Sequence, residues 1–260
     1  MLGVVALVGV GGAMPQISRY SGPVLLVMGL SLLVTAMLGA AADGASRWIM
    51  VGPLSVQVSL VFLPFMAVTF TRYPSLPGCI GIAVAAVALA LQPDRAMAGV
   101  LAFSMAVLAI TRPSRLSAGV LMVAFTAFLV SLLRPDTLPA VPYVDQILFT
   151  AFDVHVFAGA AVWLGALLLL VPPIVAWRRN AELGHVHLVF GAVWLGCIAA
   201  AALGNYPTPV VGYGGSAILG YLLTFSPLPA STRSISEHAA AADGDDAAPS
   251  DQLRRSASLA

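Results

Sequence analysis

The sequence predicts an all-α protein, a polytopic bundle of about nine transmembrane helices. Of its 260 residues, 60% are hydrophobic and only 9% are charged, and the mean hydropathy is +0.96. A soluble domain has roughly a quarter of its residues charged, whereas bilayer lipid solvates apolar side chains directly. The apolar residues also fall in runs separated by turn-forming segments, and the arginines are unevenly divided between alternate turns. These three observations indicate a membrane protein.

Nine apolar runs define the expected spans. They lie near residues 1–14, 24–42, 54–70, 76–91, 96–110, 117–133, 147–176, 186–203 and 214–229. Helices are expected, because the runs are longer than barrel strands and lack the alternation of a barrel. We therefore predict one transmembrane domain over residues 1–230. Residues 231–260 are rich in Ser, Ala, Asp, Gly and Arg, which is the composition of a disordered tail.

Arginine sets the expected orientation. With nine spans, one side of the membrane holds seven arginines, at positions 19, 72, 112, 115, 178, 179 and 233, and the other holds three, at 47, 95 and 134. The positive-inside rule places the first set in the cytoplasm, with the amino terminus outside and the tail inside. Aspartates 43, 94, 136 and 145 then share the outer side.

The first two of the four outer turns carry charged side chains. The first contains Arg47 and Trp48, which are typical of an interfacial anchor, followed by Gln57. The second is Gln92-Pro93-Asp94-Arg95, where a local ion pair between Asp94 and Arg95 is the simpler interpretation.

The third turn places Asp145 directly before a predicted span, where a carboxylate can act as a helix cap. Asp153 follows eight residues later, which is about 12 Å deeper along a continuous helix. An ionisable group at that depth costs about 3 kcal/mol and is a functional candidate, although a protonated, hydrogen-bonded Asp153 fits equally well. The neighbouring His155 is interpreted mainly as a packing residue.

The fourth turn, residues 204–216, has prolines at 207 and 209 and glycines at 204, 212, 214 and 215. Such irregular backbone at membrane depth is tolerated only where protein or a wet cavity surrounds it. The segment therefore predicts a site. The net charge of +1 gives no reason to expect a nucleic-acid partner, and the two cysteines have no metal-binding spacing.

Together the four turns resemble the SEDS family of cell-wall polymerases, the FtsW/RodA/SpoVE proteins. Arg47-Trp48-Ile49 with Gly52-Pro53, Ser55 and Gln57 looks like the family's RWI-x-x-G-P-x-S-x-Q-P-S-E stretch. Leu91-Gln92-Pro93-Asp94 is similar to its Q-P-D turn, and Pro209 followed by Tyr213-Gly214-Gly215-Ser216 is similar to its L-P-F-x-S-Y-G-G-S ending. Asp145 aligns with the acid that opens its D-F-I-F segment, and Asp153 with the first acid of its G-E-E.

The resemblance implies a helical membrane fold and transfer of a saccharide from lipid-linked disaccharide (lipid II) or another undecaprenyl-linked donor into peptidoglycan. It implies Asp145 as the catalytic base and Arg47 as the cation at the leaving diphosphate. The implied substrate-binding residues are Arg47, Trp48, Gln57, Asp94, Pro209, Tyr213, Gly214, Gly215 and Ser216. A divalent cation and a class B penicillin-binding transpeptidase partner are implied by the family alone.

The sequence also departs from the family. The family's first span is absent, its Q-P-S-E becomes Gln57-Val58-Ser59-Leu60, and the outer loop before Asp145 is cut to residues 134–146. A non-catalytic scaffold of the division or elongation machinery is therefore an open alternative. A third alternative is a proton-coupled transporter that uses Asp153 and His155.

Overall fold

The structure is a computed structural model that describes residues 14–38, 40–42, 45–51, 54–134, 144–179, 182–204, 206–209, 211 and 215–229. The chain divides into two compact units, Met1–Leu228 and Pro229–Ala260. The described residues lie almost entirely in the first unit. The predicted first span (1–14) and the predicted tail (231–260) fall outside the described residues, apart from Met14.

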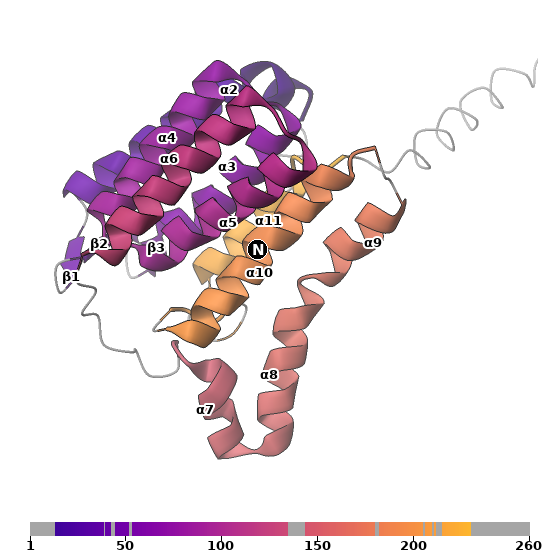
Figure 1. Ribbon diagram of the computed structural model, residues 1–260. Helices are drawn as coiled ribbons and strands as arrows, with labels where there is room; N and C mark the ends of the chain where they lie inside the picture. Colours follow the sequence, from indigo (N-terminus) through magenta and orange to yellow (C-terminus); the bar gives the residue numbers. More distant parts are fainter. Residues whose placement is uncertain are drawn as a thin grey trace, which may run out of the picture. The chain divides into compact units, whose positions relative to one another are not determined.

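The described residues are mostly helical, in agreement with the predicted all-α class (Figure 1). Each of the other eight predicted runs contains helix. The helices are α2 Met14–Leu38, α3 Val58–Arg72, α4 Leu76–Leu91, α5 Arg95–Thr111, α6 Arg115–Leu132, α7 Ile147–Val154, α8 Val156–Leu168, α9 Val171–Arg179, α10 Gly184–Leu203 and α11 Gly215–Phe225.

Four helical stretches are long and apolar enough to cross a membrane: Ser18–Leu38, Arg115–Leu132, Val156–Arg179 and Gly184–Leu203. Four more helices, α3, α4, α5 and α11, are apolar but shorter. The apolar helices indicate a membrane-embedded protein. The number of about nine spans is not confirmed, because half of these helices are shorter than 18 residues.

Local sequence explains where several helices begin. The hydroxyl of Ser75 accepts a hydrogen bond from the backbone N–H of Gly78 at the start of α4, and Pro77 occupies the first turn. Ser114 and Ser117 cap the start of α6 reciprocally. Both caps lie in turns that the sequence predicts, between residues 72 and 75 and between 112 and 115.

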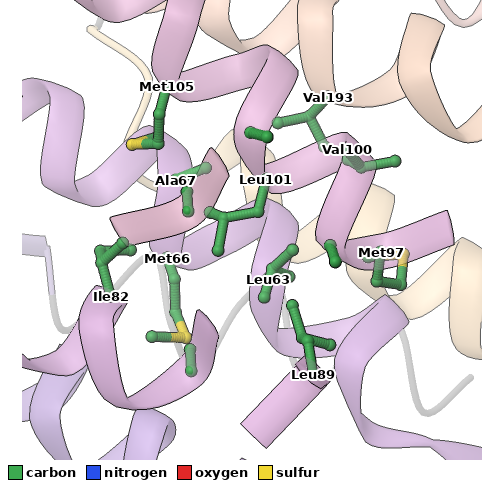
Figure 2. Close-up of a cluster of buried hydrophobic side chains, with 14 of the residues drawn as sticks. Leu63, Met66, Ala67, Ile82, Leu89, Met97, Val100, Leu101, Met105 and Val193 are labelled. Carbon is green, nitrogen blue, oxygen red and sulfur yellow. The ribbon is translucent and has the colours of Figure 1, made fainter. Parts of the chain in front are cut away.

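The core lies where α3, α4, α5 and α10 meet. α3 is buried along almost its whole length, and it packs against α10, α11 and α5. Leu63 and Met66 of α3 lie among Ile82, Leu101 and Met105 of the neighbouring helices (Figure 2). In a membrane the helices gain little from the hydrophobic effect, so close packing of such side chains supplies much of the stability.

Helices α2 and α4 approach each other closely through glycines. A methyl group added at Gly81 of α4 would lie 2.5 Å from the carbonyl oxygen of Leu25 in α2, and one added at Gly29 would meet the Gly81 carbonyl. Glycines at these positions let the two backbones approach. Any side chain there requires the helices to move apart.

We expect Gly81→Ala to lower the free energy of unfolding by about 2 kcal/mol, since overpacking a tight contact costs about 1–3 kcal/mol. Thermal unfolding of the purified protein in detergent measures the effect. Gly119→Ala on α6 is the matched control, because nothing lies within 4 Å of a methyl group at that site. Equal midpoints for the two variants would contradict the close approach of α2 and α4.

The first predicted loop forms a small antiparallel sheet, which the sequence analysis did not predict. The strands are β1 Ala40–Ala42, β2 Ala45–Val51 and β3 Leu54–Gln57, in the order β1-β2-β3. In the register of β2 and β3, Trp48 pairs with Gln57 and Ile49 with Val56. The pairing places Arg47, Trp48 and Gln57 beside one another immediately before α3.

The predicted span 147–176 is not a continuous helix. α7 ends at Val154, and α8 begins at Val156 and packs back against α7 (Figure 1). Asp153 therefore lies in the last turn of α7, at the tip of a helical hairpin, with an exposed side chain, and the helix does not continue past it as predicted. His155 caps α8: its Nδ1 accepts a hydrogen bond from the N–H of Phe157 at 3.2 Å, and it is exposed rather than packed in the interior.

Candidate functional site

Arg47 is a buried residue that holds the second predicted turn. It is 4% exposed, so it is not the surface anchor that its sequence context suggests. Its Nη2 donates to the carbonyl oxygen of Pro93 at 2.5 Å and its Nε to that of Gln92 at 3.4 Å. Trp48, its neighbour, is half-buried. The guanidinium thus joins the strand β2 to the turn between α4 and α5.

Asp94 is fully buried and does not form the predicted local pair with Arg95. Its Oδ1 accepts the N–H of Met97 at 3.1 Å, which caps α5, and its Oδ2 accepts the hydroxyl of Ser59 at 3.0 Å. The Arg95 side chain points to α6 instead, where Nε donates to the carbonyl of Ser131 at 3.2 Å. Capping by Asp94 is favourable because a carboxylate complements the positive end of the helix dipole.

Gln57 links the first turn to the fourth. Its side-chain Nε2 donates to the hydroxyl of Tyr206 at 2.9 Å and lies 3.4 Å from the Ser59 hydroxyl. Its backbone N–H donates to the hydroxyl of Ser216 at 3.0 Å. A hydrogen-bonded series therefore runs from Asp94 through Ser59 and Gln57 to Tyr206.

Asp145 belongs to the same region. It is 8% exposed and pairs with Pro207 in an antiparallel bridge, and the adjacent Val144 carbonyl accepts the N–H of Thr208 at 3.1 Å. Gln146, and not Asp145, occupies the N-cap position of α7, and the Gln146 side chain makes no capping hydrogen bond. The third and fourth turns are thus joined through their backbones.

Five further predicted site residues belong to the fourth turn. Pro209 is buried beside the bridge, and Gly215 and Ser216 begin α11. Tyr213 and Gly214 fall outside the described residues.

A groove of about 810 Å³ opens next to this polar region, between α5, α6 and α10. Its walls are apolar and include Phe103, Phe128 and Leu195. Arg47, Arg95 and Tyr206 also line it. The groove therefore combines a long apolar surface with two cationic side chains and a phenol.

The environment of Tyr206 fixes its protonation. Burial first, and then the nearby Asp94 carboxylate, raise the pKa of the Tyr206 phenol well above its ordinary value. The phenol therefore keeps its proton at physiological pH. Because its oxygen already accepts a hydrogen bond from Gln57, its own O–H is a donor.

Three buried oxygen atoms in the described part of this region have no hydrogen-bond partner there. They are Oε1 of Gln57, Oε1 of Gln92 and Oγ1 of Thr208. Buried polar atoms are normally hydrogen-bonded. These atoms can therefore accept hydrogen bonds from a ligand or from water. Among the described residues, no three His, Cys, Asp or Glu side chains gather as a metal site.

Tyr206, Ser59, Gln92 and Thr208 were not singled out as site residues from the sequence. Tyr206 and Thr208 lie inside the fourth predicted turn, and Gln92 opens the second, so their positions carried a weak signal. Ser59 carried none, because it reads as part of an apolar run.

The fold and the buried polar cluster define a membrane-embedded helical protein with a polar site at one end of its bundle. The chain matches no protein-family model, no curated protein and no solved structure.

Proposed function

We propose that this protein is a SEDS-like glycosyltransferase that uses a polyprenyl-diphosphate-linked disaccharide, lipid II, as donor. One observation carries the proposal. The four segments that bear the family-like motifs are distant in sequence, yet contacts between Arg47 and Pro93, Gln57 and Ser216, and Asp145 and Pro207 join them. Turns at one end of a bundle are neighbours in any case, but direct contacts between the motif residues themselves are what a shared site requires.

The groove supports this class of donor. A polyprenyl chain is apolar and needs an apolar surface, which α5, α6 and α10 provide. Its diphosphate needs cations and hydrogen-bond donors, and Arg47, Arg95 and Tyr206 line the same groove. The unpartnered oxygens of Gln57 and Thr208 are buried in the neighbouring polar cluster and do not line the groove itself.

In the proposed reaction, an acceptor sugar hydroxyl attacks the anomeric carbon of the donor. Asp145 removes the proton of that hydroxyl as the new glycosidic bond forms. The bond between the anomeric carbon and the diphosphate oxygen breaks, and the diphosphate leaves with the electron pair. Arg47 and Arg95 stabilise the negative charge that develops on it. The site end of the bundle then faces the outside of the bacterial cytoplasmic membrane.

The test is glycan synthesis by the purified protein from lipid II. We expect polymer from the wild-type chain and a severalfold lower rate from Ala199→Trp, because the indole fills the groove that the polyprenyl chain needs. Gly165→Trp, on α8 in a place where nothing lies within 4 Å of an added methyl group, should retain the rate. Absence of polymer from folded wild-type protein would refute the proposal.

A non-catalytic scaffold is a second candidate, and one observation favours it. Arg47 and Arg95 already donate hydrogen bonds to backbone carbonyls, so part of their capacity serves the fold. A scaffold should co-purify with a partner such as a class B penicillin-binding transpeptidase. That association should be unchanged by Asp145→Asn or Ala199→Trp.

A further inference from the structure

A second groove lies on the other side of α6, between α4 and α6. Its volume is about 620 Å³, and it is lined by Val87, Ala90, Leu91, Met122, Val123, Thr126, Ala127, Val130 and Arg134. Most of these side chains are apolar. Met122 and Leu91 are 66% and 47% exposed, so the groove is open to the surroundings of the bundle. The proposed glycosyltransferase function makes no use of it.

Arg134 is the charged residue at one end of this groove, and no acidic side chain among the described residues lines it. Its Nη1 group donates to the carbonyls of Ala90 at 3.2 Å and Leu91 at 2.8 Å, which fixes the guanidinium against the last turn of α4. Its Nε and Nη2 groups make no hydrogen bond within the described part of the chain. The fixed guanidinium therefore retains donors in the fork geometry that suits a phosphate.

The position of Arg134 along α6 fits a lipid headgroup. Nineteen residues separate it from Arg115 at the start of the helix, which corresponds to about 28 Å at the rise of an α-helix. The hydrocarbon core of a bilayer is about 30 Å thick. Arg134 follows the end of α6 at Leu132 by two residues, so the two arginines flank a helix about as long as the hydrocarbon core is thick. In a bilayer the groove beside Arg134 would lie against the acyl chains of one leaflet.

We propose that the groove between α4 and α6 binds an anionic glycerophospholipid. Its phosphate accepts hydrogen bonds from Arg134, and an acyl chain lies over Ala90 and Ala127. Charge complementarity at the rim selects this occupant over a zwitterionic lipid, because the described lining of the groove has one cation and no acid to bind the ammonium group of a zwitterionic lipid. A protein helix would fill the apolar part and leave the guanidinium donors without acceptors.

Hydrogen bonds also connect the proposed phosphate site at Arg134 with the polar cluster around Arg47. Arg134 holds the carbonyls of Ala90 and Leu91, and the next residues, Gln92 and Pro93, are those that Arg47 binds. In addition, the Arg95 guanidinium donates to the backbone carbonyl of Arg134. The lipid site itself does not depend on the proposed enzymatic function.

Native mass spectrometry of the full chain, released from nanodiscs with equal phosphatidylglycerol and phosphatidylcholine, tests the proposal. We expect the protein to retain phosphatidylglycerol about tenfold over phosphatidylcholine, because both lipids offer a phosphate but only phosphatidylcholine brings a second cation close to the Arg134 guanidinium. Arg134→Gln should remove the preference. Arg178→Gln, which removes an exposed arginine from α9, should leave it unchanged.

Thr126→Trp keeps the experiment informative if Arg134→Gln fails to fold. Thr126 is exposed in the groove, and its hydroxyl bonds only to its own helix at the Met122 carbonyl, so the indole fills the groove without touching Arg134. We expect the same loss of phosphatidylglycerol. Equal retention of both lipids by wild type, or a preference that survives Thr126→Trp, would overturn the proposal. A dimer that Thr126→Trp abolishes would assign the groove to a second copy.

Discussion

Asp145→Asn is expected to reduce glycan synthesis from lipid II by at least about a hundredfold, because a positioned general base contributes about 10²–10⁴ to the rate. Asparagine keeps the size of the side chain but cannot take a proton from the acceptor hydroxyl. The backbone bridge between Asp145 and Pro207 does not depend on the carboxylate, so the fold should be preserved. Initial rates of polymerisation at saturating donor measure the effect.

The matched control is Asp153→Asn, the same chemical change on an exposed residue at the tip of the α7–α8 hairpin. It should retain the wild-type rate. Comparable unfolding midpoints for the two variants would show that any difference in rate comes from chemistry. If Asp145→Asn retains polymerisation, then Asp145 is not the base. If only Asp153→Asn loses activity, the hairpin tip belongs to the site.

The helical segments followed from composition, because long apolar runs in a membrane protein have few alternatives to helix. Two features of the fold were not predicted from composition: the helix break at His155 and the β2–β3 hairpin. The break at His155 has neither Gly nor Pro beside it, and a helix period continues through it in the sequence. The hairpin of β2 and β3 did have a signal, since Gly52-Pro53 separates two short runs rich in Val, Ile and Trp. The helical class predicted for the whole chain outweighed this local signal for strands.

The site was predictable as a set of turns but not as a set of contacts. Asp94 was assigned to Arg95 because adjacent charges are the only partners that a local sequence shows. In the structure its partners are Met97 and Ser59, and Ser59 lies 35 residues away. Such pairing depends on the packing of α3 against α5, which no local pattern reveals.

The arginines also have partners that the sequence does not reveal. The positive-inside rule counts Arg47, Arg95 and Arg134 simply as charges on the minority side. In the structure each donates to backbone carbonyls where a helix or its following turn ends, at Gln92 and Pro93, at Ser131, and at Ala90 and Leu91. Carbonyls at a helix C-terminus lack partners within the helix and carry partial negative charge. These three arginines therefore have a structural role that a count of charges per side does not reveal.

Asp94→Ala is expected to lower the free energy of unfolding by about 3 kcal/mol. Loss of the cap on α5 costs about 1 kcal/mol, and leaving the buried hydroxyl of Ser59 without its charged acceptor costs about 2 kcal/mol. Asp94 is fully buried, so solvent does not replace either bond. Thermal or denaturant unfolding in detergent measures the change.

Asp94→Asn separates the two contributions. Its amide oxygen can still accept from the N–H of Met97 or from Ser59, so we expect it to recover at least the capping part of the loss. Ser59→Ala removes the other bond and leaves the cap in place. If Asp94→Ala and Asp94→Asn unfold at the same midpoint, the neutral acceptor has no value there, and the charge of Asp94 acts on Arg47 and Tyr206 rather than through its two hydrogen bonds. If Asp94→Ala is as stable as wild type, the buried series from Asp94 to Tyr206 does not hold the site together.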